Sequence, residues 1–175
     1  DSTKEVVNKY IDQNKSQNII LRENQVNLGL GRSYIDTAFC SRGEHYMLVC
    51  GDNSEPEESL IKLLNEVGKF DMIIPYFGSN DKRHLMRVTL SKVFTLIINL
   101  VSGYKIKYYN GPVIHKRFNV MRWNPDTHGF AYQAEIIVKV LDEKGTFHEV
   151  MIDNLDREEG SSQAFTIKNI LAVSH

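Results

Sequence analysis

The feature that most constrains this chain is a regular alternation of helix-like segments with short, continuously apolar segments. Each helix-like segment spans about 10 to 14 residues with apolar side chains at helical spacing. The apolar segments between them are typical of buried strands and comprise Asn18 to Arg22, His45 to Cys50, Phe70 to Pro75 and Thr146 to Ile152, with a more exposed alternating strand at Lys105 to Tyr109. This alternation predicts an α/β fold with a mostly parallel central sheet and helices on both faces.

The expected helices cover most of the remaining chain. They are centred on Val6 to Ile11, Tyr34 to Phe39, Leu60 to Val67, Asp81 to Gly103 and Gln133 to Leu141, with a short tail helix ending near Val173. We expect Ser54 and Glu57 to form a capping box at the start of the third helix. In the long helix, the apolar stripe Val93 to Val101 is expected to face the core, and the alternative is a surface helix that meets lipid.

Length and charge argue for one soluble domain spanning residues 1–175. The chain has 21 Lys and Arg against 22 Asp and Glu, which argues against bulk electrostatic binding to nucleic acid or to membranes. Its longest apolar run falls short of the ~20 residues of a membrane span. Cys40 and Cys50 lack metal or redox spacing, so we expect reduced thiols in the core of a cytoplasmic protein.

Two short motifs follow strand-like segments. Asn27, Gly29 and Gly31 precede a helix, where glycines permit a tight turn or a close backbone approach to a ligand. Gly51-Asp52-Asn53 ends a strand, and ligand sites in parallel sheets lie beyond the carboxyl ends of strands. The spacing alone allows two interpretations, a turn with Asp52 as a helix cap or a site for a cation bound to phosphate.

Further motifs occur in a fixed order along the chain. They are Asp1-Ser2-Thr3, Asn27-x-Gly29-x-Gly31, Gly51-Asp52-Asn53-Ser54-Glu55-Pro56, Arg87 with Ser91, Gly129-Phe130 with Glu135, Glu149-Val150, and Arg157 with Gly160 and Ser162. In this order they resemble the family-2 glycosyltransferases, especially the soluble catalytic part of the polyprenyl-phosphate glycosyltransferases. The resemblance covers nearly the whole chain and implies the nucleotide-diphospho-sugar transferase fold called GT-A.

The resemblance also implies an activity, the inverting transfer of a sugar from a nucleotide-sugar donor to a sugar, glycan or lipid-phosphate acceptor. It implies a divalent cation, Mg or Mn, held by Asp52, Asn53 and Glu55. The donor would contact residues spread along the chain, namely Asp1, Asn27, Gly29, Gly31, Asp52, Arg157 and Ser162. Arg87 would clamp phosphate, and Glu135 would act as a base or orient the acceptor.

The chain departs from the family pattern in two respects. Gly51 and Asn53 stand where the family carries a second aspartate, and the family's first strand, which holds the nucleotide base, has no counterpart before Asp1. A chain lacking its first βα unit is therefore expected. The competing hypothesis is a domain that keeps the fold but binds without catalysis. Peripheral membrane contact stays open, and the sequence carries no signal for an oligomeric state.

Overall fold

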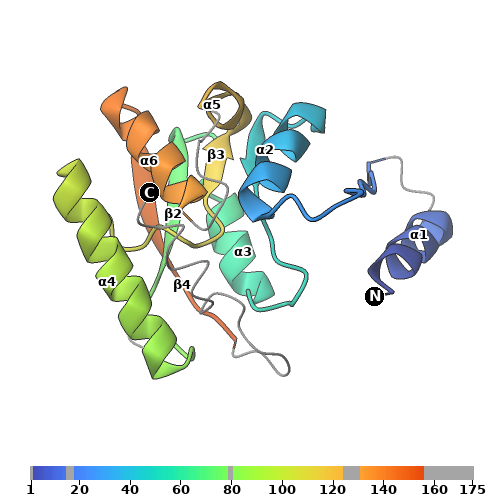
Figure 1. Cartoon of the computed structure of the whole chain (residues 1–175), viewed down its shortest axis with the longest axis horizontal. Coiled ribbons are helices and arrows are strands. Elements are labelled where there is room, and N and C mark those ends of the chain that lie inside the picture. The colour runs from blue at the N-terminus through green and yellow to red at the C-terminus, as the bar shows by residue number, and fades with distance from the viewer. Residues whose placement is uncertain (1, 15–17, 79–80, 124–130, 156–175) are drawn as a thin grey trace.

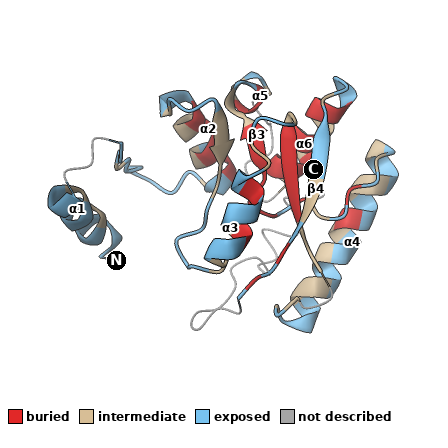
Figure 2. Cartoon of the chain, turned by 180° about the vertical axis from the view of Figure 1, so that it is seen from behind, coloured by how far each residue is buried: buried red, intermediate tan, exposed pale blue. Residues whose placement is uncertain are grey.

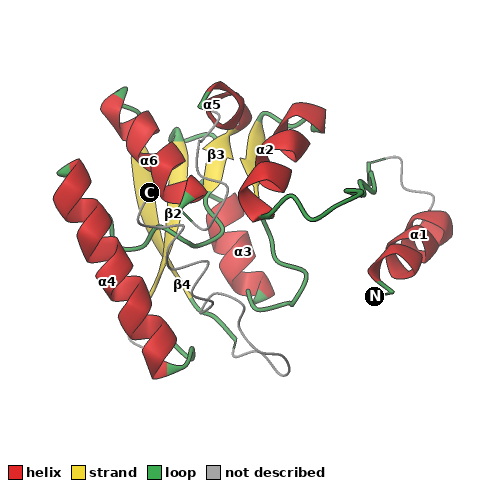
Figure 3. Cartoon of the chain, in the orientation of Figure 1, coloured by secondary structure: helices red, strands yellow, loops and turns green. Residues whose placement is uncertain are grey.

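The computed structural model describes residues 2–14, 18–78, 81–123 and 131–155, which form helices around a mixed sheet (Figure 1). In chain order the elements are α1 (Thr3–Asn14), α2 (Leu30–Cys40), β1 (His45–Met47), α3 (Glu57–Leu64), β2 (Met72–Phe77), α4 (Leu85–Ser102), β3 (Ile114–Lys116), α5 (Arg117–Arg122), α6 (Tyr132–Asp142) and β4 (Phe147–Ile152). Figure 3 shows α2, α6 and α4 on the near side of the strands and α1 apart from them.

The sheet has the order β1-β3-β2-β4. β2 and β4 pair in parallel along six residues, from Met72 opposite Phe147 to Phe77 opposite Ile152. β3 is antiparallel to both β1 and β2, so β1, β2 and β4 all run in one direction. The carboxyl ends of these three strands therefore lie at the same edge, which we call the carboxyl edge.

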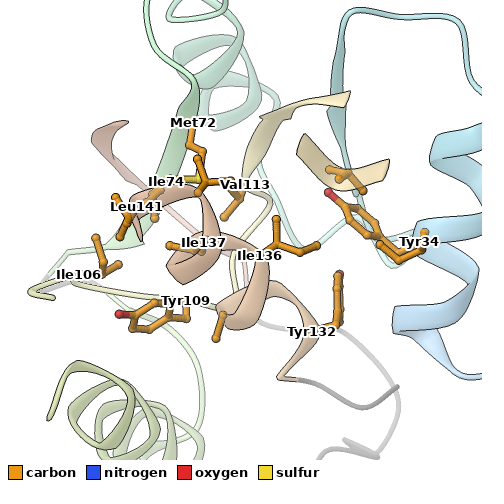
Figure 4. Close-up of a cluster of buried hydrophobic side chains, with 14 of the residues drawn as sticks. Tyr34, Met72, Ile74, Ile106, Tyr109, Val113, Tyr132, Ile136, Ile137 and Leu141 are labelled. Atoms are coloured by element: carbon orange, nitrogen blue, oxygen red, sulfur yellow. The ribbon is translucent and has the colours of Figure 1, made fainter. Parts of the chain in front are cut away.

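Side chains of β2 alternate between two hydrophobic clusters. Ile73 packs with Leu63 of α3, Ile114 of β3 and Ile152 of β4 on one face. On the other face lies a larger cluster, which Figure 4 shows around α6 and which includes Tyr34, Met72, Ile74, Ile106, Tyr109, Val113, Tyr132, Ile136, Ile137 and Leu141. The expectation of helices on both faces is thus confirmed, with α3 on one face and α2, α5 and α6 on the other.

Two expected strands are absent from the described residues. The segment 18–22 has no strand partner, and Ile20 is 69% exposed. The segment 105–109 is not a strand because a side chain satisfies its backbone. Asn99 of α4 accepts from the Ile106 amide at 3.1 Å and donates to the Ile106 carbonyl at 2.9 Å. The sequence also failed to predict β3 and α5.

Helix ends correct further expectations. α3 begins at Glu57 with Pro56 as its N-cap and without a side-chain cap, so the Ser54 capping box was wrong. α4 begins later than expected, after His84, whose Nδ1 accepts from the Met86 amide at 3.3 Å. It ends as expected at Gly103, which adopts a left-handed φ of 77°.

Exposure corrects two expectations about the core. Cys40 and Cys50 are free thiols but exposed rather than buried. The stripe Val93 to Val101 mostly faces outward instead of the core. By length and composition, the 18 residues of α4 could cross a membrane, since their mean hydropathy is 1.5 and 6% of them are buried. Figure 2 shows α4 at the margin of the molecule, largely exposed.

Candidate functional site

The loops after β1, β2 and β4 are tied together at the carboxyl edge. The Leu155 amide donates to the Ser54 carbonyl at 2.9 Å, which joins the loop after β4 to the loop after β1. Asn154 joins the same loop to the one after β2, because its Oδ1 accepts from the Lys82 amide at 3.1 Å and its Nδ2 donates to Asp81 Oδ1 at 3.0 Å. Loops from three strands thus form one continuous surface, where ligands bind in sheets of this kind.

The turn Gly51-Asp52-Asn53 presents an exposed carboxylate on this surface. Asp52 Oδ1 accepts from the Ser54 amide at 3.3 Å, and Asn53 adopts a left-handed φ of 53°. Glu55 is half-buried beside the turn. The first interpretation is confirmed in part, because Asp52 stabilises a turn but does not cap α3, and the cation site stays a prediction.

The donor set around Asp52 fits a cation shared with a phosphate ligand better than a cation held by protein alone. Among residues 2–14, 18–78, 81–123 and 131–155, no three His, Cys, Asp or Glu side chains are grouped as metal ligands. Mg²⁺ and similar hard cations often take only one or two carboxylates when phosphate and water supply the other ligands. Asp52, with oxygens of Asn53 and Glu55 nearby in the chain, can meet that lesser requirement.

The glycine motif forms the entry to α2. Asn27 Oδ1 accepts from the Gly29 amide at 2.9 Å, and Gly29 is the N-cap with φ of 81°. Gly31 is buried in the first turn. Because the carboxyl end of α2 leads directly into β1, the start of α2 lies toward the carboxyl edge. The positive φ accounts for Gly29 structurally, and a ligand contact for Asn27, Gly29 or Gly31 stays a prediction.

Arg83, in the loop before α4, is held by a nearly buried ion pair. Its Nη2 lies 2.6 Å from Asp81 Oδ2, and the two side chains are 10% and 11% exposed. Burial acts to raise the pKa of Asp81, but the hydrogen bonds and charge of Arg83 outweigh it and lower that pKa. Arg83 also donates to the Tyr108 hydroxyl at 2.7 Å and stacks over Phe77, 4.3 Å from the ring centre.

Arg87, in the first turn of α4, differs from Arg83 in that no ion pair among the described residues holds its guanidinium group. Its side chain is half-buried. Burial raises the pKa of Tyr108, while the charges of Arg83 and Arg87 oppose that rise. Both guanidinium groups therefore lie near this phenol, but the charge of Arg87 stays available to an anion.

A pocket of about 510 Å³ lies between α4 and the end of β2. Arg83, Lys92 and Lys107 line it, and its acidic lining residue, Asp81, is already paired with Arg83. Lys107 Nζ lies 3.6 Å from Glu149 Oε2 and 4.0 Å from the centre of the Tyr76 ring. The lining therefore has more basic than acidic residues and is partly aromatic, which suits an anionic ligand.

Sequence reasoning missed most of this pocket, although a signal was present. Ser91, Thr95 and Asn99 recur every four residues in a predominantly apolar helix, and all three line the pocket. A polar stripe at that spacing marks one face of a helix. Ser91 was noticed only as the partner of Arg87 in a motif, whereas Lys92 and Lys107 had no motif to indicate them.

Glu135 lies in the first turn of α6 and forms an ion pair rather than standing free. Its Oε1 is 2.6 Å from Lys139 Nζ, and its side chain is 21% exposed. The neighbouring Gln133 anchors the helix by donating to the buried Gly111 carbonyl at 2.6 Å. This geometry is that of a salt-bridged glutamate on a helix surface, and a role as base stays a prediction. Asp1, Arg157 and Ser162 lie outside the described residues, as does Gly129-Phe130.

The likeness of this sheet and its covering helices to solved structures shows the fold class, which is the GT-A fold. Solved structures with this fold include glucosyl-3-phosphoglycerate synthase from Mycobacterium tuberculosis in complex with Mn²⁺, UDP and glucosyl-3-phosphoglycerate, with a TM-score of 0.56, 11% identity and coverage of 81% of this chain and 50% of that chain. The complex of the same synthase with Mn²⁺ and UDP-glucose has a TM-score of 0.57 and 14% identity, and the match covers 89% of this chain and 52% of that chain. The complex of the synthase with phosphoglyceric acid has a TM-score of 0.58 and 14% identity, and the match covers 81% of this chain and 50% of that chain.

No protein-family model and no curated protein sequence matches the chain. At 11% to 14% identity the structural likeness shows the fold alone. The chain spans about half the length of the solved chains it resembles.

Proposed function

We propose that this chain is part of a glycosyltransferase that moves a sugar from a nucleotide-sugar donor to an acceptor. The observation that carries the proposal is the exposed Asp52 carboxylate at the carboxyl edge of a GT-A fold. The similar solved structures support the donor class, because they contain UDP or UDP-glucose together with Mn²⁺.

In the proposed reaction, the bond between the sugar's anomeric carbon and the donor diphosphate breaks as a bond to an acceptor oxygen forms. Attack from the opposite face of the sugar would invert the anomeric configuration. A divalent cation would neutralise the leaving diphosphate. Asp52 would hold that cation, with Asn53 and Glu55 as further oxygen ligands, and Gly29 and Gly31 would let the backbone approach the donor.

The positive pocket beneath α4 is the proposed acceptor site. Lys92 and Lys107 line it, and Arg87 lies near its Tyr108 wall, so an acceptor bearing phosphate or carboxylate would be favoured. The complex of the similar synthase with phosphoglyceric acid supports an anionic acceptor. If the attacking oxygen belongs to a phosphate, no general base is required, and Glu135 would then orient rather than deprotonate.

The test is cation-dependent binding of nucleoside diphosphates and nucleotide sugars, measured by calorimetry with and without Mn²⁺. We expect Asp52→Asn to lower the Mn²⁺-dependent affinity about tenfold or more, because a charged ligand is lost. Asp12→Asn, the same change at an exposed aspartate on α1, is the matched control and should leave binding unchanged. Mn²⁺-dependent binding that is the same in Asp52→Asn and in the unmodified chain would overturn the assignment.

A non-catalytic binding domain is the second candidate. It is favoured by Gly51 and Asn53 in place of a second acid. Nucleotide-sugar binding without sugar transfer or donor hydrolysis, across a panel of anionic and neutral acceptors, would favour this candidate. Turnover that disappears in Asp52→Asn would exclude it.

A further inference from the structure

The outward face of α4 is apolar along the whole helix. Eight large apolar side chains on this helix are 42% to 85% exposed. At 3.6 residues per turn they form one continuous stripe, which we call the outer face, made up of Leu85, Met86, Leu90, Val93, Leu96, Ile97, Leu100 and Val101. Scattered exposed apolar residues are ordinary, but a contiguous stripe of this length marks a surface that contacts something else.

The inward face of the same helix carries polar side chains beside apolar ones such as Phe94 and Ile98. Thr95 is buried. The Asn99 side chain donates to the Ile106 carbonyl, accepts from the Ile106 amide, and accepts from the Tyr109 hydroxyl at 2.8 Å. Ser91 and Lys92 line the pocket beneath. A surface helix in water normally turns most of its large apolar side chains toward the core, whereas eight of those on α4 face outward. The polarity of α4 therefore fits an apolar environment on its outer side.

Charge indicates which apolar environment this is. Residues 82–107 contain six Lys and Arg and no Asp or Glu. At helical spacing, Lys92 and Arg87 border the outer face on its two sides. An apolar stripe bordered by basic residues is the pattern of helices that lie in the surface of a membrane with anionic lipids. A neutral apolar protein partner would not require the absence of acidic residues over this whole stretch.

We propose that α4 lies in the surface of an anionic lipid bilayer, with its outer face in the boundary between headgroups and acyl chains. The helix does not cross the bilayer in this arrangement. Its inward side keeps Phe94 and Ile98 against the core and keeps the Asn99 hydrogen bonds to Ile106. This membrane contact is independent of the proposed sugar transfer and can be tested without any substrate.

The primary experiment is flotation of the 175-residue chain with vesicles of phosphatidylcholine alone or mixed with phosphatidylglycerol, at low and high salt. We expect co-flotation with the anionic vesicles, and weaker binding at high salt because basic residues contribute. The variant I97E/L100E places two carboxylates on the outer face and should lower binding about tenfold or more.

The matched control is I61E/L64E, which changes two exposed apolar residues at the same spacing on α3, on the opposite face of the sheet. It should bind vesicles like the unmodified chain, and circular dichroism should be the same for all three proteins. A second readout uses Leu100→Trp, whose emission should shift to shorter wavelength when anionic vesicles are added. An unshifted spectrum with vesicles present would contradict the proposal.

Two further outcomes would overturn it. The first is no co-flotation of the unmodified chain, or equal flotation of I97E/L100E. The second is a dimer, measured by light scattering, that I97E/L100E converts to a monomer while the unmodified chain fails to float. That result would assign the outer face to a second copy of the chain.

Discussion

At the scale of single residues, His115 of β3 is the most unusual buried group. It is fully buried, and neither ring nitrogen has a hydrogen-bond partner in the described part of the chain. Burial lowers its pKa to about 3. The ring is therefore neutral in the folded protein at all ordinary pH values, and a proton on it would be an unpaired charge inside the larger hydrophobic cluster.

This predicts an acid sensitivity with a definite sign. Between the unfolded pKa of about 6.5 and the folded pKa of about 3, only the unfolded chain binds the proton, so stability falls as pH falls. The contribution of His115 should be full above pH ~6.5 and decline by about 1.4 kcal/mol per pH unit below it. Denaturant unfolding at pH 7 and pH 5 should show this decline, and His115→Leu should reduce it.

The control is His148→Gln, on the exposed surface of β4, which should leave the decline in stability unchanged. An unaltered pH dependence of stability in His115→Leu would contradict the prediction.

A second prediction concerns Gly51. A Cβ added at this position would meet nothing within 4 Å, and its backbone does not have a positive φ. Gly51→Asp should therefore fold with unchanged stability and place a second carboxylate beside Asp52. We expect tighter Mn²⁺ binding in the presence of a nucleoside diphosphate, measured by calorimetry. A loss of thermal stability would show that the turn is more restricted than its open surroundings indicate.

At the scale of elements, Asp71 joins the starts of β2 and β4 to the end of β3. Its carboxylate accepts from Lys116 Nζ, the Thr146 amide and the Thr146 hydroxyl, each at 2.7 Å. The hydrogen bond from Lys116, followed by those from Thr146, lowers its pKa to about 2. This stabilisation is present above the unfolded pKa of about 3.8 and is lost as pH falls toward 2.

Asp71→Asn should lower the free energy of unfolding by about 1 to 2 kcal/mol at pH 7, because a charge-assisted bond is replaced by neutral contacts. The pair with Lys116 is partly exposed, so the larger value implied by the pKa shift is not expected. Glu66→Gln, which breaks the exposed pair with Lys69, is the control and should change stability by less than about 0.5 kcal/mol. Equal effects of the two substitutions in denaturant unfolding would sink this assignment.

The elements also show how far sequence reasoning extends. The periodicity of α2, α4 and α6 and the apolar runs of β1, β2 and β4 are local signals, and these elements were predicted. The segment 105–109 has strand-like alternation, but Asn99 takes its hydrogen bonds, and that contact is invisible to local patterning. The same limit applies to the site, where the Asp52 turn has a motif but the pocket lysines converge only through folding.

At the scale of the whole molecule, α1 is the element least connected to the rest. It has no buried residue, and Figure 1 shows it apart from the sheet and its covering helices. Lys4 pairs at 3.0 Å with Glu23, and both side chains are more than half exposed. Apolar residues such as Val6 and Tyr10 face outward at 63% and 56% exposure.

Deleting residues 1–14 should therefore change the free energy of unfolding of the remainder by less than about 0.5 kcal/mol. For comparison, Ile137→Ala in the core of α6 should cost about 2 to 5 kcal/mol, because Ile137 is fully buried. Denaturant unfolding of the two variants provides the measurement. A deletion as costly as Ile137→Ala would mean that α1 contributes to the main core in solution.

The order of the strands determines where a further strand could join the sheet. Within the described strands, β1 bonds only to β3 and β4 bonds only to β2, so each has one side where backbone amides and carbonyls can accept another strand. A strand added beside β1 and running in its direction would end next to the Gly51-Asp52-Asn53 turn, and its final residues would become new walls for any ligand there. A strand added at the β1 edge would therefore change ligand selectivity. A strand added at the β4 edge would instead extend the surface next to Asp153 and Asn154.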